Sequence, residues 1–385
     1  MLDGDLLPGR ATREGTRGFA ARFPNLKGHF RRPDDLELSS LGLGTRPGEP
    51  NGGDDLLYRA AVPQALERGL NVFDTALSYR MQTSERCLGA ALRRVFAEGQ
   101  VERDHVYVIS KGGYLAPDPD VVRGTEQARR YLIETYVESG LVDPDEVVAG
   151  NHSLEPAFLT DQIDRSRRNL GLATIDLYCL QDPELHLVAK GPDEFRRLLA
   201  RALETLEDAV ARGAIAAYGL STWHGLLVPH AERGHLSVVD CLELALDVGG
   251  SDHHLRAIQL PYSIAMGEAA GLPSQFGPSG LTPVLETLRG TGTAIFASVP
   301  LVRGRAVRGL PRFLRKAFPE LTTDAQCALQ FVRSTPGVTT VLVGMRQSQH
   351  IEENLALTEH SPADEGVIRE LFERAATAEA EHGPR

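Results

Sequence analysis

The sequence predicts an α/β protein built as a (β/α)8 TIM barrel. Short β-branched runs alternate with stretches of helical periodicity, and eight such runs occur within about 350 residues. No GxGxxG motif opens a helix after the first predicted strand, which disfavours a dinucleotide-binding doubly wound sheet. Alternation alone does not define strand order, so the doubly wound sheet remains the alternative fold.

The elements follow from apolar runs for strands and from 3.6-residue periodicity for helices. The strands are expected at residues 36–45, 71–75, 105–110, 174–180, 214–220, 254–260, 293–297 and 339–343. The helices are expected at residues 54–68, 84–98, 157–170, 193–212, 323–333, 348–358 and 362–379. Asp54 is predicted to cap the first helix, and Gly69 is predicted to end it.

Two segments depart from this alternation. Residues 1–35 contain several Arg, Gly and Pro residues and are expected to form an N-terminal arm that wraps the surface or is mobile, ahead of a single barrel domain over residues 36–385. After the third strand, residues 112–156 form a long insertion with a helix expected over 125–139. On a barrel such an insertion borders the active-site mouth, so it is either a lid or a tolerated surface addition. Helices over residues 348–379 close the chain.

Composition narrows the function classes. The chain has 385 residues, a formal net charge of −11, and no apolar run near the roughly 20 residues of a membrane helix, so neither a nucleic acid nor a membrane is an expected partner. The N-terminus lacks the apolar core of a secretory signal. No CxxC pair occurs among the four cysteines, so we expect no metal site and no disulfide framework, and a reducing cytoplasmic setting.

Charged residues end two neighbouring predicted strands. Asp74 ends the run VFD, and Lys111 ends the run VISK, where a barrel carries its catalytic groups. Since a buried carboxylate and a buried ammonium are favourable only when paired, we expect an Asp74–Lys111 ion pair. Tyr79 follows Asp74 by five residues. A neighbouring cation favours a phenolate, so Lys111 is expected to lower the pKa of Tyr79 and make it a proton donor and acceptor near neutral pH.

The segment containing these residues resembles a known family signature. Residues 69–88, GLNVFDTALSYRMQTSERCL, are similar to the G-x-N-x-F-D-T-A-x-x-Y…S-E-x-x-L-G pattern of the aldo-keto reductase family. The resemblance continues in order along the chain through VISKGG, TIDLYCLQDPE, AYGLST, IQLPYS, FASVPLVRG and PGVTTVLVGMRQSQHIEENL. The first motif is highly specific, and the others support it through their order and spacing.

The resemblance implies an NAD(P)H-dependent oxidoreductase that reduces an aldehyde, ketone or sugar carbonyl, or oxidises the matching alcohol. It implies that Tyr79 is the general acid, tuned by Lys111 and Asp74, and that Ser221 and Gln259 bind the nicotinamide carboxamide. The remaining implied cofactor-binding residues lie near later strand ends: Thr222, Ser298, Pro300, Leu301, Arg303, Gly304, Gly344, Arg346, His350, Glu353 and Asn354. Independently of the family, a helix N-terminus near Ser348 beside Arg346 suits a phosphate.

The sequence also departs from the family pattern. Gln181 stands where most members have a histidine at the end of the fourth strand, and an amide can donate a hydrogen bond but cannot titrate. His152 on the insertion is a candidate to replace that histidine in the substrate pocket, and the alternative is an ordinary surface histidine, which is more common for a lone histidine on a loop. Thr222 replaces a common asparagine, and Ser298 replaces a common aromatic residue that stacks on the nicotinamide. Trp223, the single tryptophan, is the expected substrate-contacting aromatic residue.

The predicted phosphate loop lacks the lysine and one arginine of the strongest phosphate-binding sites. Arg346, helped by a protonated His350, can still bind a ribose 2′-phosphate, so NADP is the first expected cofactor and NAD is a close second. The leading expectation is an enzyme acting on a small carbonyl or alcohol. The alternative is a cofactor-binding redox sensor or scaffold barrel with vestigial catalysis. A third possibility, reduction of a conjugated C=C bond, ranks last because Gln181 carries no acidic proton. The sequence leaves the oligomeric state open.

Overall fold

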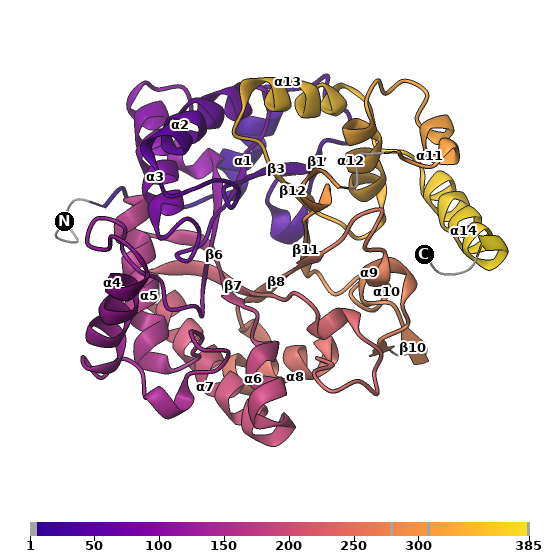
Figure 1. The fold of residues 1–385 in the computed structure, drawn as a ribbon. Helices are drawn as coiled ribbons and strands as arrows, with labels where there is room; N and C mark the ends of the chain where they lie inside the picture. The colour runs from indigo at the N-terminus through magenta and orange to yellow at the C-terminus, as the bar shows by residue number, and fades with distance from the viewer. Residues whose placement is uncertain (1–5, 278–279, 306–308, 383–385) are drawn as a thin grey trace.

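The fold is a closed barrel of eight parallel strands surrounded by helices (Figure 1). The computed structural model describes residues 6–277, 280–305 and 309–382. In barrel order the strands are β3 (Leu41–Gly44), β4 (Val72–Asp74), β5 (Tyr107–Gly112), β6 (Ile175–Gln181), β7 (Ile215–Ser221), β8 (Leu255–Pro261), β11 (Ala294–Ser298) and β12 (Thr340–Gly344). The predicted (β/α)8 fold is confirmed, because β12 pairs in parallel with β3 and closes the cylinder.

The helices mostly follow the strands that precede them in the sequence. In chain order they are α1 (Arg13–Ala21), α2 (Gly52–Glu67), α3 (Thr83–Ala97), α4 (Thr125–Leu132), α5 (Pro156–Leu170), α6 (Glu184–Lys190), α7 (Pro192–Ala211), α8 (Val238–Gly249), α9 (Glu268–Gly271), α10 (Val284–Thr287), α11 (Arg312–Ala317), α12 (Asp324–Ser334), α13 (Ser348–Ala356) and α14 (Glu365–His382). Outside the barrel, β1 (Phe30–Arg31) pairs with β2 (Leu38–Ser39), and β9 (Gln275–Gly277) pairs with β10 (Gly280–Thr282).

Local capping explains several helix boundaries. Thr323 and Gln326 form a reciprocal capping box at the start of α12, and α5 ends at Gly171 with a left-handed φ of 69°. The predicted cap of α2 is wrong by one turn. Asn51 caps this helix by accepting a hydrogen bond from the Asp54 backbone N–H, so Asp54 lies in the first turn and its carboxylate is available elsewhere.

The amino-terminal segment lies across the end of the barrel where the strands begin. Leu7 exchanges backbone hydrogen bonds with Gly171 and Ala173, and the Ala11 N–H donates to Asp176 Oδ1 at 2.6 Å. Phe19 of α1 is fully buried in the main core. The described part of the predicted arm therefore wraps the surface through specific contacts, and residues 1–5 lie outside the described residues.

The insertion packs beside the barrel. It contains α4 and the π-helical turn η4 (Ile133–Val137), close to the helix expected over residues 125–139. Tyr136 packs edge-on against Phe158 of α5, with the ring centres 5.4 Å apart. Figure 1 shows α4 next to α5 at the edge of the molecule. The stem of the insertion, where Tyr114 pairs with His152, reaches the carboxyl end of β6.

Candidate active site

The carboxyl ends of adjacent strands bring the predicted chemical groups together. Gln181 at the end of β6 is in register with Ser221 of β7, and Ser221 is in register with Gln259 of β8. Asp74 and Lys111 lie on the neighbouring strands β4 and β5. The barrel therefore gathers onto one rim residues that are more than 180 positions apart in the sequence.

A buried ion pair lies at the centre of this rim. The Lys111 ammonium donates to Asp74 Oδ1 at 2.5 Å and to the Thr75 carbonyl at 2.8 Å. Lys111 is fully buried and Asp74 is almost so. Burial lowers the pKa of Lys111, but the charge of Asp74 and the hydrogen bond to it raise this pKa above its ordinary value. The ammonium is therefore charged at neutral pH, as the pairing argument predicts.

Tyr79 lies directly against this pair. Its ring centre is 4.8 Å from Lys111 Nζ, and only 9% of the residue is exposed. The predicted lowering of its pKa is wrong. Burial raises the pKa of Tyr79 by more than Lys111 lowers it, and the Asp74 carboxylate adds to the increase. The phenol consequently stays protonated at neutral pH, which suits a proton donor.

The turn after Tyr79 has an unusual backbone. Arg80, Met81 and Gln82 all adopt left-handed conformations, with φ of 47°, 53° and 72°. The buried Arg80 guanidinium holds the turn through Asp55 at 3.0 Å and Ser84 at 2.9 Å. A strained backbone of this kind persists only where surrounding contacts stabilise it. Here the contacts of Arg80 stabilise the strained turn and thereby hold the loop that carries Tyr79.

Gln181 is half-buried beside the tyrosine loop. Its Oε1 accepts a hydrogen bond from Ser78 Oγ at 3.2 Å, one residue before Tyr79. Because the amide oxygen is occupied in this way, the amide N–H group is the part of Gln181 that can donate to another molecule.

His152 does not take the place of the absent histidine. It is fully buried, with Nε2 2.7 Å from the Gln181 carbonyl oxygen and Nδ1 3.1 Å from His186 Nε2. Burial lowers the pKa of His152 to about 4, so the ring is neutral. Both ring nitrogens therefore contact groups within the protein, and the prediction that His152 donates to a substrate is wrong.

Thr222 Oγ1 and Gln259 Oε1 are among the buried side-chain oxygen atoms that have no partner within the described residues, and both residues are less than 5% exposed. Buried polar atoms are normally paired, so these oxygens mark a place for a ligand that donates hydrogen bonds. Ser221, Thr222 and Gln259 together offer donors and acceptors, and this set matches a carboxamide.

Trp223 is held at the mouth by a residue that the sequence analysis missed. Glu184 Oε1 accepts hydrogen bonds from the backbone N–H groups of Trp223, His224 and Gly225, at 2.7, 3.0 and 3.2 Å. The exposed Arg46 guanidinium lies 5.9 Å from the Trp223 ring centre. No local motif indicates either contact, because each joins segments far apart in the sequence.

Tyr114 and Asp182 form a further pair that the sequence analysis missed. The Tyr114 hydroxyl donates to Asp182 Oδ2 at 2.7 Å. Burial raises the pKa of Asp182 to about 6, although the hydrogen bond from Tyr114 opposes this shift. Asp182 directly follows Gln181 and has a left-handed φ of 48°. This pair therefore places a carboxyl group that titrates near pH 6 at the mouth.

The loop after β11 carries the next group of predicted residues. Ser298 ends this strand half-buried, Pro300 is buried, Leu301 is half-buried, and Arg303 is exposed. Val299, Val302 and Arg303 have positive φ values of 55°, 45° and 54°. Valine rarely adopts a positive φ because its Cβ is branched. The backbone from Val299 to Gly304 is therefore held in an uncommon conformation.

The end of β12 and the start of α13 form the last predicted group. Gly344 is exposed, Arg346 and Glu353 are half-buried, His350 is exposed, and Asn354 is buried. Among the described residues no side chain caps the N-terminus of α13, so the first turn can offer backbone N–H groups to an anion. Arg346 is nevertheless already paired, since its Nε is 3.2 Å from Asp54 Oδ1 on α2. No sequence motif indicates this ion pair, because Asp54 and Arg346 are far apart in the sequence.

The described residues contain no cluster of three or more His, Cys, Asp or Glu side chains that could hold a metal ion. All four cysteines, Cys87, Cys179, Cys241 and Cys327, are free and buried. Among the described helices, none combines the length and apolarity needed to cross a membrane.

Comparison with known proteins decides the family. The family model described as "Aldo/keto reductase family" matches residues 40–234, about half of the 385 residues. The chain belongs to the aldo-keto reductase family. This match covers β3 to β7, and hence Asp74, Tyr79, Lys111 and Ser221.

Curated relatives match shorter stretches of this aldo-keto reductase. An aldo-keto reductase of Gibberella moniliformis is 33% identical over 115 residues, which cover 29% of this chain and 33% of the relative. A D-threo-aldose 1-dehydrogenase of a Pseudomonas species is 32% identical over 163 residues, which cover 42% of this chain and 43% of the relative. The matched segments thus span less than half of either relative.

Solved aldo-keto reductase structures share the whole fold. One from Klebsiella pneumoniae, in complex with NADP and acetate, has a TM-score of 0.57 at 19% identity and covers 93% of this chain and 96% of its own. A glycerol dehydrogenase from Gluconobacter oxydans has a TM-score of 0.63 at 18% identity and covers 93% and 97%. At these identities the likeness concerns the fold.

Proposed function

We propose that this aldo-keto reductase is an NADP(H)-dependent oxidoreductase that reduces the carbonyl group of a small aldehyde, ketone or sugar, or oxidises the matching alcohol. The observation that carries the proposal is the contact of a buried, protonated phenol with a buried ammonium, 4.8 Å from ring centre to nitrogen, beside Asp74. A phenol held in this way can give its proton to a carbonyl oxygen.

The residues around the rim fit a nicotinamide dinucleotide. Ser221, Thr222 and Gln259 would bind the carboxamide, because two of their buried oxygens have no partner in the described part of the chain. Residues 299–304 would pass along the pyrophosphate, and Arg346 with the N-terminus of α13 would bind the adenosine end. The bound nicotinamide supplies or accepts the hydride. NADP is the first cofactor because Arg346 can bind a 2′-phosphate, and NAD is the second.

In the reducing direction, the proton on the Tyr79 hydroxyl moves to the substrate oxygen. The resulting phenolate lies beside the Lys111 ammonium, which stabilises the negative charge, and solvent returns the proton. Asp74 keeps Lys111 charged and in place. Gln181 orients the carbonyl by donating from its amide nitrogen, since Ser78 occupies the amide oxygen. The amide cannot titrate, so Tyr79 alone supplies the proton.

The proposed partner is a small polar molecule. The names of two similar proteins, an aldose dehydrogenase and a glycerol dehydrogenase, support a polyhydroxy substrate. A net charge of −11 does not suit a nucleic acid. Four free, buried thiols support a reducing compartment, and we propose the cytoplasm.

Tyr79→Phe tests the proposal. The variant should reduce the rate of NADPH-dependent carbonyl reduction by about 10³-fold, because the proton donor is lost while the ring and its packing remain. Nicotinamide absorbance with a panel of aldehydes, ketones and sugars measures turnover, and quenching of Trp223 fluorescence measures cofactor binding, which should change little. Equal rates in variant and parent would remove Tyr79 from the reaction.

The same assays distinguish the oxidoreductase from the second candidate function, a cofactor-binding sensor or scaffold barrel. Gln181, in place of the usual histidine, is the observation that favours this second function. A sensor or scaffold barrel would bind NADPH without turning over any substrate in the panel. In that case Tyr79→Phe would leave every measured property unchanged.

A further inference from the structure

An ion pair bridges the start of the first barrel helix and the end of the last barrel strand. Arg346 Nε, two residues beyond β12, lies 3.2 Å from Asp54 Oδ1 in the first turn of α2. The Asp54 side chain is 13% exposed and that of Arg346 is 32% exposed. The contact is therefore more shielded than the fully exposed surface pairs that contribute little.

Contacts other than the ion pair with Arg346 also hold Asp54 in position. Its Oδ2 accepts the Glu49 N–H at 2.7 Å, and its own N–H donates to the Asn51 cap. Gly48, with φ of 113°, allows a close approach, since a Cβ there would lie 2.6 Å from Arg346 Nη1 and 2.8 Å from Asp54 Oδ2. These contacts hold the Asp54 carboxylate in position beside the Arg346 guanidinium.

The connecting loop also covers the neighbouring strand end. A Cβ on Gly344 would lie 2.5 Å from Pro47 Cγ, and the Pro47 carbonyl accepts the Tyr58 hydroxyl at 2.8 Å. The loop that positions Asp54 therefore lies directly against the region proposed to bind the nucleotide. Any phosphate that reaches Arg346 arrives next to a fixed carboxylate.

We propose that Asp54 determines the cofactor preference by competing with a 2′-phosphate for Arg346. The inference rests on the proposed function, because it takes Arg346 as the phosphate-binding residue. A phosphate must share or displace the carboxylate, and the two negative groups repel each other. A ribose hydroxyl is neutral and meets no such repulsion. Asp54 thus weakens NADP binding and leaves NAD binding almost unaffected, so the protein accepts both cofactors.

Asp54→Asn tests this inference through binding. The amide retains an oxygen for the Glu49 N–H and removes only the charge. Isothermal titration should show NADPH binding tightened by about fivefold or more, with NADH binding changed by less than about twofold. Adenosine 2′,5′-bisphosphate and AMP, which differ only in the 2′-phosphate, should repeat this difference without any turnover.

Two further variants define the controls. Asp247→Asn removes an equivalent charge from the exposed pair between Arg196 of α7 and Asp247 of α8, 3.0 Å long, and should leave the binding of both nucleotides unchanged. In the Arg346→Ala background, Asp54→Asn should lose most of its effect, because the two residues act on one phosphate. Thermal melting checks that each variant is folded.

The outcomes distinguish the inference from the proposed function. If the parent protein binds neither nucleotide, the proposed function fails and the inference fails with it. If the parent binds NADPH and Asp54→Asn leaves the NADPH-to-NADH affinity ratio unchanged, only the role of Asp54 is overturned. An equal gain for NADPH in the Asp247→Asn variant would also overturn it, since the effect would then reflect net charge alone.

Discussion

Burial governs the chemistry of individual residues at the mouth of the barrel. Lys111 is charged because Asp74 is 2.5 Å away, whereas Tyr79 is neutral because it is withdrawn from water. The sequence indicated which three residues meet, since they follow neighbouring strands. It did not indicate the protonation of Tyr79, because desolvation depends on how completely distant segments cover a side chain.

Asp182 provides a prediction on pH and stability. Its pKa is raised to about 6 in the folded protein, against roughly 3.9 in an unfolded chain. The folded state therefore binds this proton more tightly than the unfolded state does. The contribution of Asp182 to the free energy of unfolding is fully present below about pH 4 and is lost as the pH rises through about 6. Asp182→Asn, which can still accept the Tyr114 hydroxyl, should be more stable than the parent at pH 8 by about 1 kcal/mol.

Denaturant unfolding at pH 8 and pH 5 measures this effect. The advantage of Asp182→Asn should shrink at pH 5, where the parent carboxyl is increasingly protonated. Asp247→Asn, at an exposed ion pair, controls for the general loss of a negative charge. A difference that is the same at both pH values would contradict the role assigned to burial.

At the scale of elements, most barrel strands and the strongly periodic helices were predictable, whereas α6 and α8 were not among the expected helices, and the contacts that attach the elements were not predictable. Each of the last seven barrel strands lies within two residues of its predicted bounds at both ends, because apolar periodicity marks it. The cap of α2 was misplaced by one turn, since Asn51 and Asp54 both suit a cap. His152 was misassigned because the sequence around a loop histidine does not indicate which carbonyl group its ring will contact.

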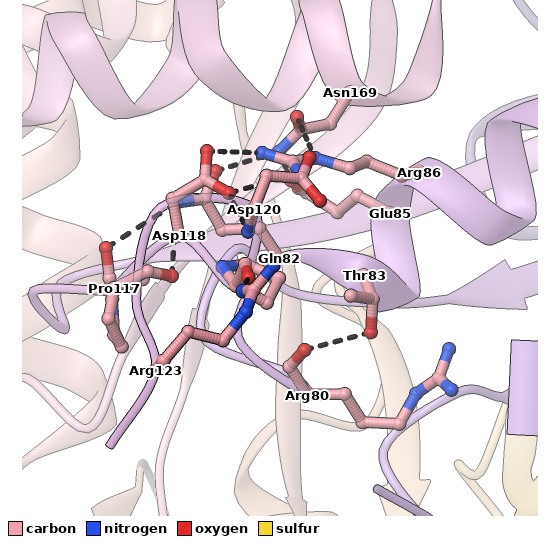
Figure 2. A network of polar contacts seen from close by, with 12 residues as sticks. Arg80, Gln82, Thr83, Glu85, Arg86, Pro117, Asp118, Asp120, Arg123 and Asn169 are labelled. Atoms are coloured by element: carbon pink, nitrogen blue, oxygen red, sulfur yellow. Dashed lines mark hydrogen bonds and ion pairs between the residues drawn. The ribbon is translucent and has the colours of Figure 1, made fainter. Parts of the chain in front are cut away.

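The insertion illustrates an attachment that only the structure shows. Figure 2 shows the Arg86 guanidinium of α3 reaching Asp118 and Asp120, with shortest distances of 2.6 Å to each. Arg86 also donates to Asn169 at 3.1 Å, and Gln82 donates to the Pro117 carbonyl at 3.2 Å. The first part of the insertion is therefore fastened to the helix that follows the Tyr79 loop.

Arg86→Ala should loosen the insertion without unfolding the barrel. Losing a two-pronged, partly buried pair should raise the rate of proteolytic cleavage within residues 112–156 by about tenfold, with a small change in Tm. Limited proteolysis followed by mass spectrometry locates the cuts. Arg94→Ala on the same helix removes an exposed pair with Glu98 and is the matched control. Equal cleavage in both variants would show that Arg86 does not hold the insertion.

At the scale of the whole molecule, the two ends of the barrel have different roles. The rim at the carboxyl ends of the strands carries the proposed chemistry, while residues 6–35 pack against the opposite end, which contains a buried ion pair. There Asp176 accepts from Arg103 and from the Val108 N–H, each at 2.8 Å, and from the Ala11 N–H. The alternation of elements predicted the barrel, but no local signal placed Arg103 beside Asp176.

Asp176→Asn should therefore lower stability and spare the site. Removing one charge leaves Arg103 buried and unpaired, which costs about 3 kcal/mol in the free energy of unfolding. Chemical denaturation measures that loss, and cofactor titration at a temperature where the variant is folded should match the parent. A variant of parental stability, or one with weakened cofactor binding, would contradict this division of roles.

The most direct measurement is a crystal structure of the protein soaked with NADP. We expect the carboxamide to bind Ser221 and Gln259, and the reactive carbon of the nicotinamide to lie beside the Tyr79 hydroxyl. A nucleotide bound elsewhere, or a nicotinamide ring turned away from Tyr79 and Lys111, would contradict it.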